Sequence, residues 1–247
     1  MKKNQTFYTT IYTILIFAIF VIPYYFIDLP FAQFDNIFIS ITIFLFATLV
    51  GFFISRQAAR YGQIVAKVTD FDGNISFLFR SIGVFDKKYQ NISAEILGKH
   101  YREIQSHGDW DFYFSQKTTT ITDMHELFVA CARSGDLDPA QSAIVSRAFF
   151  GLGEMQKIRK NLIALYQEKI PYFQWVFIFF LTAILIFTVS FLPSTGIVSA
   201  SLVKAAFSTA VIFVISMLWQ LNHLTFFETM VGASSAQDVL DIIAGSK

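Results

Sequence analysis

Four apolar stretches, two on each side of a long polar middle, constrain the fold of this chain more than any other feature. Each is roughly 18 to 21 residues long and almost free of charge, so an α-helix of that length can cross a hydrocarbon core of about 30 Å. The stretches cover residues 7–27, 37–54, 172–192 and 202–221. They predict an all-α integral membrane protein with four transmembrane helices, arranged as two hairpins.

Composition agrees with this class. Hydrophobic residues make up 54% of the chain and the formal net charge is only +1, which suits a lipid bilayer better than a nucleic-acid surface. The single cysteine, Cys131, cannot form an intramolecular disulfide and fits a reducing cytoplasm. The first apolar stretch is too long for a typical signal peptide and no small-residue cleavage site follows it, so we expect it to be retained.

The positions of the basic residues predict the orientation. Of the 19 lysine and arginine residues, only Lys204, at the foot of the fourth stretch and close enough to the interface to snorkel, lies away from the N-terminal stub, the middle and the tail. The loop between the first two stretches carries Asp28 and Asp35 and no base. We therefore expect both termini and the middle to be cytoplasmic. The membrane itself is expected to be a prokaryotic inner membrane, which the charge pattern alone does not indicate.

The expected organisation has four parts: a first hairpin (1–54), a cytoplasmic helical domain (55–170), a second hairpin (171–224) and a cytoplasmic tail (225–247). Nothing breaks a helix between Phe52 and Ala66, so the second span should continue into the cytoplasm. Breaks are expected at Gly83, at Gly108–Asp109 and at Ser134–Asp136.

Two helix starts stand out in the sequence. The first is Asp138–Gln141, with an Asp cap, a proline at the first helical position and a glutamine at the third. An apolar stripe follows it at helical spacing: Ile144, Ala148, Leu152, Met155, Ile158, Leu162 and Leu165. The second is Ser234 with Gln237, which predicts a short amphipathic helix on the bundle or on the membrane surface.

Catalytic and metal motifs are weak, and we expect neither an enzyme nor a cofactor. The histidines lack ligand spacing, and His125–Glu126 has no second histidine for a zinc site. The run Asp70–Asn74 resembles a calcium loop without its closing glutamate, so a solvated helix break is the preferred interpretation. His107, Asp109 and Asp111 surround Trp110 in an expected loop, where a metal is no better supported.

The second span carries the candidate pore. Ser40, Phe44 and Thr48 recur every four residues and form one stripe of a helix, with Gly51 close to it. Phe44 could form a dewetting constriction or present its positive ring edge to an anion. On the residues alone, ordinary helix packing is the preferred interpretation of this stripe and pore lining the alternative, because serine and threonine commonly join helices in membranes.

Arg56 and Arg60 follow the second span and lie one turn apart just inside the expected membrane. They are consistent with headgroup anchors. In an oligomer they would also form rings of positive charge at the cytoplasmic mouth of a pore, which concentrate anions. Charge reversal at both positions should then lower anion preference.

The segment Gly51–Tyr61, GFFISRQAARY, resembles the exit of the pore helix in bestrophins, and the wider layout resembles the bestrophin-like domain family of unknown function. Further similarity lies in Tyr101–Trp110, Ile170–Trp175 and Phe226–Gly232. The resemblance implies a homo-oligomer, pentameric in true bestrophins, with the second span lining an anion pore. Ser40, Phe44 and Thr48 would match the neck of that pore, which two hydroxyl residues make less hydrophobic here. The calcium-sensing cluster of animal bestrophins has no clear counterpart.

Three functions stay open on the sequence. The leading hypothesis, which the resemblance implies, is an oligomeric, passive, chloride-selective channel. The spans carry no intramembrane acid or base, which argues against a proton or ion relay but not against a passive pore. The alternative is a non-conducting scaffold or sensor whose cytoplasmic domain binds a partner protein. A motor stator would have to use the hydroxyls of the later spans, which are Thr182, Thr188, Ser208, Thr209 and Ser216.

Overall fold

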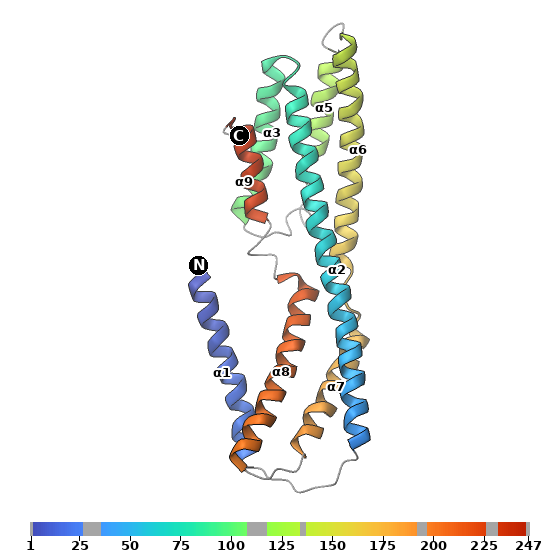
Figure 1. Ribbon diagram of the computed structural model, residues 1–247. Coiled ribbons are helices and arrows are strands. Elements are labelled where there is room, and N and C mark those ends of the chain that lie inside the picture. The colour runs from blue at the N-terminus through green and yellow to red at the C-terminus, as the bar shows by residue number, and fades with distance from the viewer. Residues whose placement is uncertain are drawn as a thin grey trace. The chain divides into compact units, whose positions relative to one another are not determined.

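The computed structural model describes residues 2–26, 36–107, 118–133, 137–191, 197–225 and 232–245, and within these ranges it contains eight helices and no strand (Figure 1). The all-α prediction is thereby confirmed. In chain order the helices are α1 (Lys2–Phe26), α2 (Asn36–Ile82), α3 (Lys87–His107), α5 (Thr120–Arg133), α6 (Pro139–Gln167), α7 (Tyr172–Ser190), α8 (Ile197–His223) and α9 (Gly232–Ile243).

The chain divides into two compact units. The first unit combines Met1–Ala58 with Ile170–His223, and the second combines Ala59–Lys169 with Leu224–Lys247. Helix α2 contributes its first part to the first unit and the rest to the second.

Three helices are long and apolar enough to cross a membrane. They are α2, α7 and α8, and in each of them fewer than half of the residues of the most apolar window are buried. In α1, the apolar part with described side chains is the shorter segment Ile14–Phe26. The end of the first predicted span at residue 27 and the acidic loop with Asp28 and Asp35 lie outside the described residues.

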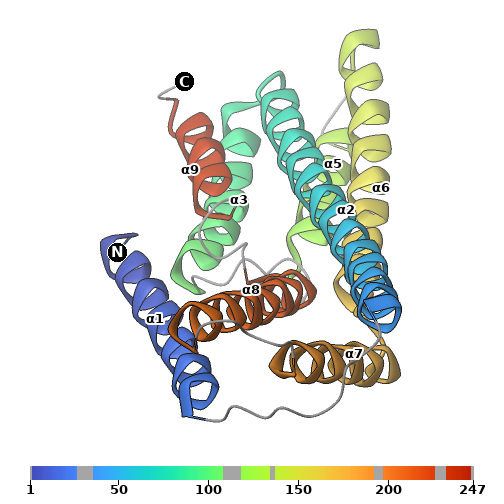
Figure 2. The ribbon, with the colours of Figure 1, turned by 60° about the horizontal axis from the view of Figure 1, so that its bottom comes forward.

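Helices α2, α7 and α8 share the apolar core of the first unit. From α2 the core takes Phe46, Val50 and Phe53; from α7 and α8 it takes Trp175, Ile178, Leu181, Leu185, Val211, Ile215 and Leu218. Helix α1 packs on α8, and the two views show them crossing where α1 ends and α8 begins (Figures 1 and 2). Burial of one stripe per helix thus leaves the remaining faces apolar and exposed.

Helix α2 runs unbroken for 47 residues, which confirms the continuity predicted between Phe52 and Ala66. The helix break expected at Asp70–Asn74 is wrong, because α2 passes through it and ends at Ile82, beside the predicted break at Gly83. Tertiary contacts explain the difference. Phe71 and Asp72 are both buried, and the hydroxyl of Tyr101 donates to Asp72 Oδ1 over 2.6 Å.

Helix α6 begins where the sequence predicts. Asp138 accepts from the Gln141 amide over 2.7 Å, and the Gln141 side chain accepts from the Asp138 amide, which completes a capping box. Ala148, Leu152, Met155, Ile158 and Leu162 are buried, as the stripe predicts; Ile144 and Leu165 are only half-buried, and Val145 is buried in place of Ile144.

Helix α9 lies on the bundle. Ala236 and Val239 are buried in the core of the second unit, and Gln237 Oε1 accepts from Gln105 Nε2 of α3 over 2.9 Å. The sequence predicted that this helix lies either on the bundle or on the membrane surface, and the structure shows it on the bundle. Ser234 is not the cap, since α9 already includes Gly232.

Three groups of expected features lie outside the described residues. They are the breaks at Gly108–Asp109 and Ser134–Asp136, the loop around Trp110, and most of the Phe226–Gly232 segment.

Candidate pore-lining face of helix α2

Four of the six candidate pore residues lie on one exposed face of α2 within the first unit. Ser40, Phe44, Thr48 and Gly51 are all exposed, and 68% of Phe44 is accessible. A β-carbon added at Gly51 would meet no atom of the described residues within 4 Å, so the described part of the subunit leaves this face open at that level.

The opposite face of α2 holds the helix in the first unit. Thr42, Phe46, Val50 and Phe53 are buried there at intervals of three and four residues. The Thr42 hydroxyl donates to the Phe38 carbonyl over 2.9 Å, so this buried hydroxyl is satisfied by its own helix. One face of α2 therefore packs inward, and the candidate face is turned away from the subunit's own core.

The two arginines do not share the candidate face. At about 100° per residue, Arg56 lies about 120° round the helix from the middle of the stripe, and its side chain is exposed.

Arg60 is turned inward and only 3% exposed. Its Nε donates to the Leu165 carbonyl over 2.6 Å and its terminal nitrogen donates to the Tyr166 carbonyl over 2.8 Å. These carbonyls belong to the last turn of α6, where a cation complements the helix dipole. Within one subunit Arg60 thus joins α2 to the end of α6.

Two residues that the sequence analysis passed over continue the candidate face. Ser55 and Ala58 follow Gly51 at four and seven residues, and both are exposed. Their spacing was the available signal, since residues four and seven apart share a face of a helix. From Ser40 to Ala58 the face is therefore lined by small, hydroxyl and aromatic side chains, and the aliphatic Ile37 lies at its beginning.

A polar cluster joins α1, α7 and α8 at one end of the first unit. The Tyr24 hydroxyl lies 2.9 Å from Ser208 Oγ and accepts from Ser190 Oγ over 3.3 Å, while Ser201 Oγ donates to the Tyr24 carbonyl over 2.9 Å. Lys204 Nζ donates to the Ser190 carbonyl, at the end of α7, over 3.1 Å. At this end of the first unit, Tyr24 and Lys204 therefore both form hydrogen bonds to residues of neighbouring helices.

Two of the five hydroxyls proposed for a stator bond inside their own helix. Thr182 Oγ1 donates to the Ile178 carbonyl and Thr188 Oγ1 to the Ile184 carbonyl. Thr209 is buried, and among the described residues its hydroxyl has no hydrogen-bond partner. None of these three hydroxyls is hydrogen-bonded to a carboxylate of the described residues, and a proton relay needs such a partner.

His100 of α3 and Thr120 of α5 form a buried polar pair in the second unit. His100 is 3% exposed, and its Nδ1 lies 3.1 Å from Thr120 Oγ1. Burial, helped by the positive charge of Arg159, lowers the pKa of His100 to about 4. Among the described residues, no three histidine, cysteine, aspartate or glutamate side chains gather as metal ligands would.

The long helices, with their exposed apolar side chains, define a helical membrane protein. The chain belongs to the bestrophin-like domain family, whose family model matches residues 29–224. No curated protein and no solved structure matches the chain. The family accordingly supports a lipid environment and an oligomer.

Proposed function

We propose that the protein is an oligomeric, passive, anion-selective channel whose pore is lined by the exposed face of α2. The observation that carries this proposal is the combination of family membership with a face of Ser40, Phe44, Thr48 and Gly51 that is exposed in the part of the chain that the structure describes. Four helices in one subunit are too few to enclose a pore and still pack. A ring of subunits, each contributing one α2, meets this requirement.

The chemistry of the face suits an anion. Ring edges of Phe44 carry partial positive charge, and a circle of them would form a narrow constriction that dewets easily. Hydroxyls from Ser40 and Thr48 would replace part of the hydration shell of a passing ion one turn on either side of it. Arg56, exposed beyond the face, supplies positive charge at the pore mouth in this proposal.

The proposed topology has four spans, with the second unit and both termini in the cytoplasm. Helix α1, with 25 residues, has a length of about 37 Å and could form the fourth span. Concentration of the basic residues outside the spans supports the orientation, and Lys204 is the exception.

Aromatic residues support the placement of the cytoplasmic boundary. Trp175, near the start of α7, and Trp219, near the end of α8, have ring centroids 5.2 Å apart. Tryptophan is enriched where lipid meets water, so this pair fits the membrane interface. At the same end of the helices, Asn222 Oδ1 accepts from the Ile170 amide over 2.7 Å and fixes the beginning of α7 to the end of α8.

Cysteine accessibility along α2 tests the proposal. Ser40, Phe44, Thr48 and Gly51 are replaced one at a time by cysteine, and a negatively charged, water-soluble thiol reagent is added to the protein in liposomes. We expect all four to react, because each faces an aqueous lumen. Leu45→Cys is the matched control. The Leu45 side chain is exposed like that of Phe44 (48%), but it lies about 100° round the helix from Phe44.

Equal protection of all five cysteines, in protein shown to be folded and inserted, would contradict the proposal. In that case the candidate face would contact lipid or another helix, and a non-conducting scaffold with a cytoplasmic protein partner would become the better account. Reaction at Leu45 as fast as at Phe44 would equally remove the stripe from the mechanism.

A further inference from the structure

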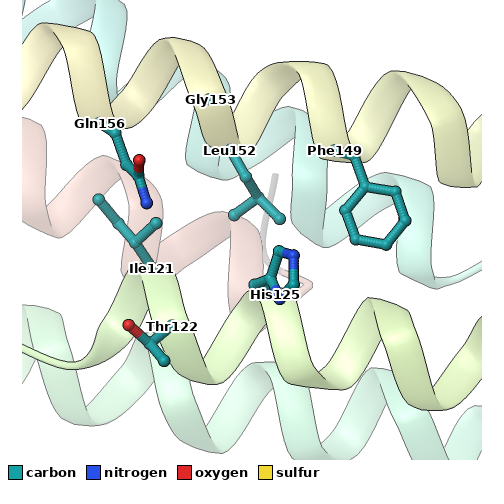
Figure 3. A pocket seen from close by; sticks show the side chains of 7 residues that line it. All are labelled: Ile121, Thr122, His125, Phe149, Leu152, Gly153 and Gln156. Carbon is teal, nitrogen blue, oxygen red and sulfur yellow. The ribbon is translucent and has the colours of Figure 1, made fainter.

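A hollow lies between helices α5 and α6 of the second unit (Figure 3). Its volume is about 480 Å³, which falls within the roughly 300–1,000 Å³ of typical binding pockets. The lining residues are Ile121, Thr122 and His125 of α5 and Phe149, Leu152, Gly153 and Gln156 of α6.

The lining favours an aromatic ring. Ile121, Leu152 and Phe149 supply apolar surface, and the His125 ring lies 5.2 Å from the Phe149 ring (Figure 3). Gly153 leaves one side open, since a β-carbon added there would meet nothing within 4 Å. A ring entering the hollow could therefore pack edge-to-face against His125 and Phe149.

The second unit also exposes an aromatic side chain that lacks a cover in the isolated subunit. Phe150 of α6 is 71% exposed, more than any other large apolar side chain described in this unit. It lies one residue after Phe149, about 100° round the helix, so it points away from the hollow of its own chain.

Charges on the two helices are complementary. Exposed bases of α6 include Arg147 and Lys160, as well as Lys157, which pairs with Glu154 of the same helix over 2.6 Å. Helix α5 exposes Glu126 beside the hollow, with Arg133 about two turns further along the helix. An α6 helix from a second copy, laid against α5, would bring bases close to this carboxylate, which favours that partner over an unrelated apolar surface.

We propose that, in the oligomer, Phe150 of each subunit enters the α5–α6 hollow of the next subunit. The inference rests on the proposed function for the existence of the oligomer and adds the contact that joins its cytoplasmic units. Because Phe150 and the hollow are different surfaces of one chain, the contact is heterologous. A heterologous contact repeated by a closing rotation produces a ring, which a central pore requires.

Cross-linking between two differently tagged variants tests this contact. Phe150→Cys with one tag and Thr122→Cys with another are co-expressed, and the membranes are oxidised. We expect a covalent dimer that carries both tags, and none when either variant is expressed alone, because two copies of the same position do not meet. Phe150→Cys with Lys99→Cys is the control pair, since Lys99 is exposed on α3 away from the hollow.

A second variant fills the hollow without disturbing the helix backbone. Gly153→Leu, added to both tagged chains, should lower the yield of the covalent dimer several-fold, because the leucine side chain occupies the space that residue 150 of the next subunit enters. Gly73→Leu is the matched control, because Gly73 is likewise helical with open space at its β-carbon. It should leave the yield unchanged.

The mass of the detergent-purified oligomer separates the two proposals. An oligomer that gives no cross-link between Phe150→Cys and Thr122→Cys overturns the inference and leaves the channel proposal standing. A monomer overturns both. A cross-link that persists undiminished in Gly153→Leu would show that Phe150 does not occupy the hollow.

Discussion

Arg60 of α2 holds the end of α6, because its Nε donates to the Leu165 carbonyl over 2.6 Å across 105 positions of sequence. The same guanidinium also binds the Tyr166 carbonyl, and the side chain is almost completely buried. A single guanidinium group thus fixes helix α2 to helix α6, at the point where the chain leaves α6 for α7.

Replacing Arg60 with methionine should destabilise this end of the second unit. Loss of two charge-assisted hydrogen bonds costs about 2–3 kcal/mol of unfolding free energy and leaves two carbonyls of half-buried residues without that donor. Faster amide hydrogen exchange in the last turn of α6 and a lower unfolding temperature in detergent would register the loss. Arg56→Met, at an exposed position, should change the unfolding free energy by about 0.5 kcal/mol or less. Equal effects of the two changes would contradict the account of Arg60.

His100 should make the second unit acid-sensitive. Its pKa is about 4 in the folded state and 6.5 in a model peptide, so between these values the unfolded chain binds more protons than the folded one. The stabilisation is therefore complete above about pH 6.5 and is lost as the pH falls toward 4, by about 3 kcal/mol at most. Denaturant unfolding across this range measures the effect. His100→Gln should remove that part of the pH dependence, and an unchanged slope in this variant would exclude His100 as its origin.

Cys131 should be unreactive in the folded protein. Its side chain is fully buried, and burial raises the pKa of the thiol to about 11, so the thiolate that attacks thiol reagents is scarce at neutral pH. A maleimide should label it only after denaturant unfolds the second unit. Rapid labelling of the native wild-type chain would contradict the packing around α5, and it would also require Cys131 to be replaced in the cross-linking experiments.

Local signals predicted several parts of this fold correctly. The Asp138 cap, the stop near Gly83 and the uninterrupted helix from Phe52 to Ala66 all depend on residues a few positions apart. Such interactions are fixed by the chain itself, so a single sequence contains them.

Features that depend on distant partners were not predictable in this way. The sequence around Asp72 is compatible with an exposed side chain. In the structure, the hydroxyl of Tyr101, from another helix, donates to its carboxylate. Arg60 likewise has the pattern of a membrane-anchoring base, and only the approach of α6 buries it. Periodicity located the Ser40–Thr48 stripe, but its exposure follows from packing of the opposite face of α2.

The central claim is that the candidate face of α2 lines an anion pore, and single-channel recording tests it most directly. Purified wild-type protein and Phe44→Ala are compared in planar bilayers under a chloride gradient. We predict a wild-type reversal potential near the chloride equilibrium value, and a larger unitary conductance in Phe44→Ala because the constriction is widened. Absence of current from inserted, folded protein would contradict the channel, and identical conductance in the two proteins would contradict the role of Phe44.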